Sequence, residues 1–253
     1  MRRNNRFTQI QSVNSVIRVL IFRQGKAETS VIPLSDSIRA HRTPWVTYVL
    51  LALNIGIYAL TAVFGLVDYD QVIQTYGLIP FRVMRSFDAE AVTDLISSLF
   101  LHGSLLHLGG NMLYLWIFGD NVEDALGHMG YLIFYLIGGL LASAAHVLVN
   151  PTSMLPTIGA SGAIAAVLGA YLVLYPASQV RTLIPLGFFV RIALLPAALV
   201  LGLWFVLQLF EGFLAVGANA DVGGVAIWAH VGGFVIGALL ARFIVPSRSR
   251  KRG

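Results

Sequence analysis

Cysteine is absent from this 253-residue sequence, which excludes disulfide bonds, thiolate metal ligands and a cysteine nucleophile. Charged residues are scarce at 11%, less than half of the roughly 25% that is usual in soluble domains. The first 43 residues also lack the long apolar block of a cleavable signal peptide. What the chain has instead is a 57% apolar share, more than one soluble core of this length can bury. The composition therefore predicts an integral membrane protein.

The apolar residues come in blocks of about 20, the length that crosses the hydrocarbon of a bilayer. Because a bilayer offers the backbone no hydrogen-bond partners, each block should form a helix. The expected fold class is all-α, a polytopic membrane protein with six transmembrane helices. The expected spans are Trp45–Leu66, Leu105–Asn121, Met129–Val149, Thr157–Tyr175, Ile192–Leu214 and Val225–Val245.

The positive charges predict the orientation of these spans. Of the 17 Lys and Arg residues, all except Arg82 and Arg85 lie before the first span, between spans four and five, or at and beyond the end of span six. The positive-inside rule then places both termini in the cytoplasm. Because the basic residues flank spans instead of lining a groove, we expect membrane lipids as partners and no nucleic acid.

The spans divide the chain into three expected parts. Residues 1–43 form an N-terminal cytoplasmic segment, residues 44–245 the six-span core and residues 246–253 a basic cytoplasmic tail. The outer loop from Val67 to Ser104 is long and carries apolar residues, so we expect it to be folded. The apolar stretch Val180–Arg191 suits an interfacial segment on the inner side.

Four polar residues inside the predicted spans need a physical reason, because polar groups in hydrocarbon are costly. His107 and Asn111 are spaced i, i+4 and share one face of the second span. That pair is compatible with an interhelical polar contact as well as with a functional site. Gln208 and Glu211, near the outer end of span five, are expected to reach the lipid headgroups.

Ser161 and His230 are the other two residues of this set. Ser161 lies at the outer start of span four, just inside the N-terminus of the expected helix, where free N–H groups favour negative charge. A serine nucleophile needs a base within hydrogen-bond reach, and His230 lies at a similar depth in span six. Small residues allow these two spans to approach closely: Gly162, Ala166 and Ala170 on one, Gly233 and Gly237 on the other. Packing alone would also explain a serine or a histidine at these positions.

Three short motifs then match a known family in order and placement. His107-Leu-Gly-Gly-Asn111, Gly159-Ala-Ser161-Gly162 and Ala229-His230-Val-Gly-Gly233 fall on spans two, four and six. The segments around Leu101-His102, Phe118-Gly119-Asp120-Asn121 and Tyr131-Leu132 agree as well. From about Thr43 to Ala241, the chain resembles the bacterial-type, six-span rhomboid intramembrane serine proteases.

This resemblance implies a rhomboid-like bundle with a Ser–His dyad that works without metal or cofactor. Ser161 would be the nucleophile and His230 the general base, and the oxyanion hole would combine the Ser161 N–H with Asn111 and His107. Gly162 and Gly233 would be helix-packing positions near the site. Substrates would be transmembrane proteins, cut within or next to their spans, with span five as the side where they gain access. The expected location is the plasma or inner membrane of a prokaryote.

Two features depart from the family pattern. The Trp-Arg pair that many relatives carry in the first outer loop is missing, and Ala165 occupies the place of an aromatic residue that would stack on the histidine. Neither change removes a reacting group. Ala165 does leave the packing of His230 without an explanation.

Two alternatives from other classes stay open at this point. A proteolytically dead relative that binds membrane clients should lack Ser161 or His230, yet both are present. A transporter or channel usually carries charged residues near mid-membrane or paired broken helices, and flux into proteoliposomes would identify one. Metalloproteases need a His-Glu-x-x-His motif, and aspartyl enzymes need two intramembrane aspartates; the sequence has neither.

Overall fold

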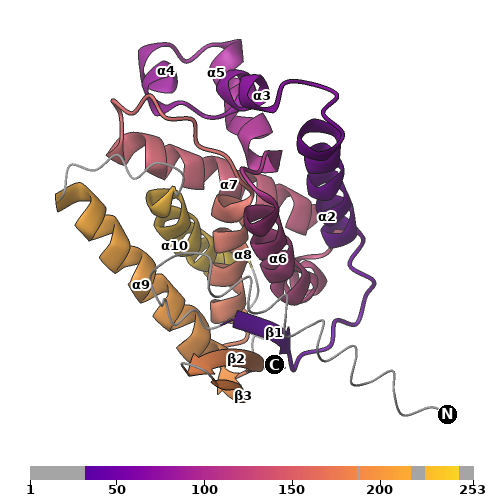
Figure 1. The fold of residues 1–253 in the computed structure, drawn as a ribbon. Helices are drawn as coiled ribbons and strands as arrows, with labels where there is room; N and C mark the ends of the chain where they lie inside the picture. The colour runs from indigo at the N-terminus through magenta and orange to yellow at the C-terminus, as the bar shows by residue number, and fades with distance from the viewer. Residues whose placement is uncertain (1–31, 187–188, 218–225, 245–253) are drawn as a thin grey trace.

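The computed structural model describes residues 32–186, 189–217 and 226–244. These residues form a bundle of long helices with short helices at one end and a small sheet at the other (Figure 1). Residues 1–31, 187–188, 218–225 and 245–253 lie outside the described residues, and these include Val225 and Val245, the expected ends of span six. The helical membrane bundle predicted from the sequence is confirmed.

Four helices are long and apolar enough to cross a membrane. They are α2 (Trp45–Tyr58, continued by the π-helical turn η1, Ala59–Val63), α7 (His128–Val149), α9 (Ala197–Gly217) and α10 (Ile227–Ile244). A fifth candidate is a pair bent by 81°, in which Ala89–Phe100 leads into α6 (Leu105–Leu126). The chain is therefore a multi-pass membrane protein, with four or five spans by length and composition among the described residues.

The remaining long element, α8 (Ser161–Leu174), lies in the middle of the bundle (Figure 1). Its side chains from Gly162 to Tyr171 are all buried, as expected for a helix that is apolar on every face. With 14 residues it is about 21 Å long, well short of the roughly 30 Å of bilayer hydrocarbon. The expected span Thr157–Tyr175 was too long, because Gly159 has a φ of +126° and cannot continue a helix.

Helix α8 packs against α10 and α7 through small residues. A Cβ atom added to Gly169 would lie 2.0 Å from the carbonyl oxygen of Phe234, and one added to Gly237 would lie 2.0 Å from that of Ala166. A Cβ on Gly138 of α7 would meet the Cβ of Ala166 at 2.7 Å. The backbones of these helices therefore touch where glycine permits it, as small residues allow in membranes.

The loop between α2 and α6 is folded, as expected, at one end of the bundle (Figure 1). It contains α3 (Tyr69–Tyr76), α4 (Pro80–Arg85), α5 (Ala89–Ser97) and the 3-10 turn η2 (Ser98–Phe100). Asp68 and Asp88 cap α3 and α5 by accepting hydrogen bonds from backbone N–H groups of the first turn. A bridge between Leu78 and Thr157 ties this region to the loop before α8.

The opposite end of the bundle carries a three-stranded antiparallel sheet that the sequence analysis missed. Its strands are β1 (Ile32–Asp36), β2 (Gln179–Leu186) and β3 (Phe189–Pro196), in the order β1-β2-β3. The expected fifth span, which began at Ile192, was wrong at its start because helix α9 begins only at Ala197. Pro196 is disfavoured inside a helix, and the preceding β-branched residues favour a strand.

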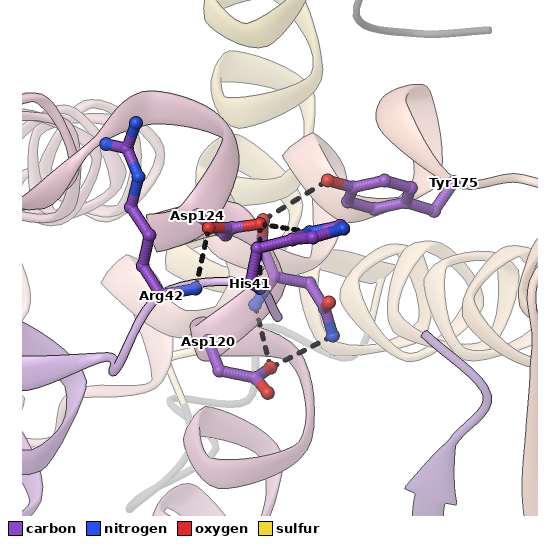
Figure 2. A network of polar contacts seen from close by, with 6 residues as sticks. His41, Arg42, Asp120, Asp124 and Tyr175 are labelled. Carbon is purple, nitrogen blue, oxygen red and sulfur yellow. Dashed lines mark hydrogen bonds and ion pairs between the residues drawn. The ribbon is translucent and has the colours of Figure 1, made fainter. Parts of the chain in front are cut away.

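Polar contacts join the segment before α2 to the end of α6. The backbone N–H groups of His41 and Arg42 donate to the Asp124 carboxylate at 3.1 and 3.2 Å (Figure 2). The buried Glu123 carboxylate accepts from the backbone N–H groups of Val46 and Thr47, at 3.0 and 2.8 Å. Glu123 therefore caps the N-terminus of α2, where the helix dipole favours a negative charge.

Candidate active site

Ser161 is the first residue of α8, and the loop before it is held in place by Gly159. The N–H of Gly159 donates to the carbonyl oxygen of Ser98 at 2.8 Å. Its positive φ suits glycine, and a Cβ at this position would lie 2.8 Å from the His107 ring. Glycine is thus required both for the turn that starts α8 and for the space beside His107.

The structure brings Ser161 and His230 together although 69 residues separate them. His230 Nε2 lies 2.8 Å from Ser161 Oγ. The contact depends on the close approach of α8 and α10, because a Cβ on Gly233 would lie 2.3 Å from the carbonyl oxygen of Gly162. The geometry allows the imidazole to take the serine proton.

His107 and Asn111 lie on α6 and face the same site. The N–H of Gly103 points at His107 Nδ1 at 3.5 Å, a long hydrogen bond that leaves Nε2 to carry the proton of the neutral ring. Asn111 is buried, and its Nδ2 has no hydrogen-bond partner among the described residues. A buried donor without a partner is unusual and requires an explanation.

A cavity of about 240 Å³ joins these four residues. Ser161, His230, His107 and Asn111 all contribute to its wall. The rest of the wall is largely apolar and consists of Leu106, Gly110, Tyr114, Ile164, Ala165, Leu168 and Trp204. The cavity therefore brings a serine hydroxyl, two imidazole rings and a side-chain amide together beside a largely apolar wall.

The other side of His230 contacts α9, which the sequence analysis did not anticipate. His230 Nδ1 lies 2.5 Å from Gln208 Oε1, and the Trp204 ring lies 6.0 Å from the imidazole. Trp204 accounts for the packing of His230 that Ala165 left unexplained. The prediction that Gln208 reaches the headgroups was wrong. The sequence did contain an indication of this contact, because a polar residue within a predicted span usually has a partner inside the bundle.

His102 is a buried neighbour of His107. Its side chain is buried, and its ring lies 5.2 Å from that of His107. In the described part of the chain, no group of three His, Cys, Asp or Glu residues is arranged to hold a metal ion.

Comparison with known proteins identifies the family. The Rhomboid domain model matches residues 89–247, which is more than half of the chain and includes Ser161, His230, His107 and Asn111. This chain belongs to the rhomboid family.

Individual rhomboid relatives are distant in sequence. The chain is 27% identical to rhomboid protein 1, mitochondrial, of Saccharomyces cerevisiae, over 82% of this chain and 55% of the yeast protein. It is 32% identical to rhomboid protease GluP of Bacillus subtilis over 51% of this chain and 24% of that protein. With rhomboid protease GlpG of Salmonella paratyphi A it shares 26% identity over 87% of this chain and 70% of the relative. The chain spans about half the length of the first curated relatives it matches.

Proposed function

We propose that this chain is an intramembrane serine endopeptidase that hydrolyses peptide bonds within or next to the transmembrane segments of membrane-anchored proteins. The observation that carries the proposal is the 2.8 Å contact between Ser161 Oγ and His230 Nε2 beside a largely apolar cavity. Relatives named rhomboid proteases support it.

The proposed reaction has two halves. Ser161 Oγ attacks the carbonyl carbon of the substrate while His230 Nε2 takes its proton, and the C=O electron pair moves onto the oxygen. The C–N bond then breaks, and Nε2–H gives its proton to the leaving amine. In the second half, water attacks the acyl-enzyme, Nε2 accepts the proton of the water, and that proton returns to Ser161 when the acid product leaves.

The oxyanion would be stabilised by the backbone N–H of Ser161 and by the side chains of Asn111 and His107. The Nδ2 of Asn111 has no hydrogen-bond partner in the part of the chain that the structure describes, and this supports the role, because such a donor can bind charge that develops only in the transition state. The proposed dyad needs no cofactor.

The remaining parts of the proposal concern the placement of the protein. We count the bent pair that contains α6 and the short helix α8 as two further spans, which brings the total to six. The sheet end carries Arg181 and Arg191 and would face the cytoplasm, with α4 and its Arg82 and Arg85 on the other side. Residues 1–43 and 246–253 would then be the cytoplasmic segments that flank the core. A prokaryotic plasma or inner membrane suits this arrangement.

The deciding experiment uses purified protein and a fluorescent single-span substrate with a small residue and helix-breaking residues in its span. We expect cleavage by the wild type and none by Ser161→Ala or His230→Ala at unchanged melting temperature. A fluorophosphonate probe should label the wild type and not Ser161→Ala. Turnover by purified Ser161→Ala would overturn the assignment of the nucleophile.

A further inference from the structure

Helix α9 presents a row of three side chains at helical spacing to the proposed dyad. Trp204 and Gln208 both reach the His230 ring, and Gln208 Nε2 donates to Glu211 Oε2 at 3.1 Å. Trp204, Gln208 and Glu211 are spaced i, i+4 and i+7, so they lie along one face of the helix. An amide inside a long apolar helix is costly unless it has partners, and here it has one on each side.

The hydrogen bonds made by His230 are compatible with one tautomer of the neutral ring. For Nε2 to accept the proton of Ser161, the ring proton must be on Nδ1. Nδ1–H then needs an acceptor, and the Gln208 carbonyl oxygen lies 2.5 Å away. The opposite tautomer would point a lone pair of Nδ1 at the lone pairs of Oε1 and would leave Nε2 unable to act as a base.

Glu211 fixes which end of the Gln208 amide faces the histidine. A carboxylate oxygen only accepts hydrogen bonds, so the amide turns its NH₂ group toward Glu211 and its carbonyl toward His230. A flipped amide would place two oxygens against each other at Glu211. The direction of donation is thus set along the whole chain: Ser161 donates to His230 Nε2, His230 Nδ1–H donates to the carbonyl oxygen of Gln208, and the NH₂ group of Gln208 donates to Glu211.

We propose that Gln208 is a positioning residue that holds His230 in the Nδ1–H tautomer and orients the ring toward Ser161, with Glu211 fixing the amide. This inference rests on the proposed protease function. During the reaction Nε2 gains the serine proton, Nδ1 keeps its own, and Gln208 Oε1 accepts Nδ1–H before and after that transfer. No proton passes to Gln208 or Glu211. A neutral amide supplies the acceptor beside the imidazole without a charge in contact with the ring.

The test compares variants that keep or remove the acceptor. Gln208→Leu has similar bulk and no acceptor, whereas the double variant Gln208→Glu with Glu211→Gln exchanges amide and carboxylate and restores one. Leu207→Met, on the exposed face of the same helix, is the matched control. For each purified protein, kcat, KM, melting temperature and the rate of fluorophosphonate labelling at Ser161 are measured with the single-span substrate.

We expect kcat of Gln208→Leu to fall by roughly 10- to 100-fold, a part of the 10²–10⁴-fold that a general base supplies. KM and melting temperature should change little, labelling should slow in parallel with kcat, and the exchange variant should recover most of the loss. Unchanged kcat in Gln208→Leu, or a loss that follows melting temperature and is not recovered, would overturn the positioning role. Wild-type protein without Ser161-dependent cleavage would instead mean that the proposed protease function is wrong.

Discussion

Gly233 is the position where a single added methyl group should separate the two halves of the proposed dyad. It lies on α10, three residues after His230, and faces the carbonyl oxygen of Gly162, the residue after Ser161. In Gly233→Ala the new Cβ would stand 2.3 Å from that oxygen, whereas ordinary van der Waals contact begins at 3.4 Å. The obstacle is backbone, so no side chain can rotate away and the helices must move apart.

The required movement is about 1 Å, applied next to a hydrogen bond of 2.8 Å. A misplacement of about 1 Å in a catalytic arrangement can cost on the order of 10²-fold in rate. Overpacking a core costs about 1–3 kcal/mol of stability. We therefore expect Gly233→Ala to remain folded with a lowered melting temperature, while kcat for the single-span substrate falls by roughly 10²-fold or more.

Gly202→Ala is the matched control, because a Cβ at Gly202 of α9 would meet no atom of the described residues within 4 Å. This variant should keep its activity and gain up to about 1 kcal/mol of stability, since alanine favours a helix over glycine. The assay measures kcat and thermal unfolding of both variants in the same detergent. Wild-type kcat in Gly233→Ala would refute the reasoning, because it would mean that contact between the α8 and α10 backbones does not set the serine–histidine distance.

Three further predictions concern individual side chains. Asn111→Ala should lower kcat by 10²–10³-fold, or roughly 2.7–4 kcal/mol, with KM nearly unchanged; a lowered melting temperature with near-normal kcat would give Asn111 a structural role instead. Glu123→Ala leaves the N–H groups of Val46 and Thr47 without their acceptor and should cost about 2–4 kcal/mol in thermal or denaturant unfolding, a prediction that an unchanged melting temperature would contradict. Burial raises the pKa of the Asp36 carboxyl, so the folded protein binds the carboxyl proton more tightly than the unfolded chain does. The ionisation of Asp36 should therefore lower the free energy of unfolding as pH rises above about 4. Asp36→Asn should abolish that part of the pH dependence, and parallel stability curves for wild type and variant would argue against it.

The helical bundle was predictable because membrane helices depend on local composition. A block of about 20 apolar residues has few alternatives to a helix in hydrocarbon, so α2 with its continuation η1, α7 and α10 lie within a few residues of their predicted ends wherever these ends are described. Helix α8 starts four residues later than the predicted span, because its start is set by the backbone conformation of Gly159 and not by hydropathy. Hydropathy therefore did not reveal that Ser161 begins a short helix inside the bundle.

The sheet could not be predicted by the same reasoning. The apolar stretch Val180–Arg191 was predicted to be an inner interfacial segment, and Ile192 to begin span five. Strand pairing instead depends on β1, which is more than 140 residues away along the chain. Asp36 of β1 accepts hydrogen bonds from Asn121 of α6 and from Tyr171 of α8. Contacts of this kind form only when distant segments pack, and local hydropathy patterns do not indicate them.

The candidate site shows the same division between local and distant determinants. Ser161, His230, His107 and Asn111 were found from the sequence because each breaks an apolar pattern. Gln208 breaks such a pattern as well, but its position near the end of a span offered lipid headgroups as a sufficient partner. Only the packing of α9 against α10 reveals that its carbonyl faces Nδ1 of His230.

Two kinds of contact therefore hold the two nitrogens of the His230 ring. The distance from Nε2 to Ser161 is set by backbone contact between α8 and α10, which cannot change without separating the helices. The acceptor for Nδ1 comes from side chains of α9, a helix with buried residues near its start and exposed Val206, Leu207, Phe210 and Phe213 farther along. Movement of this part of α9 would leave the serine and the histidine together but would remove Trp204 and Gln208 from the ring. If substrates gain access beside α9, as the rhomboid resemblance implies, the base would be fully oriented only after α9 returns, and cleavage would be linked to closure of the site.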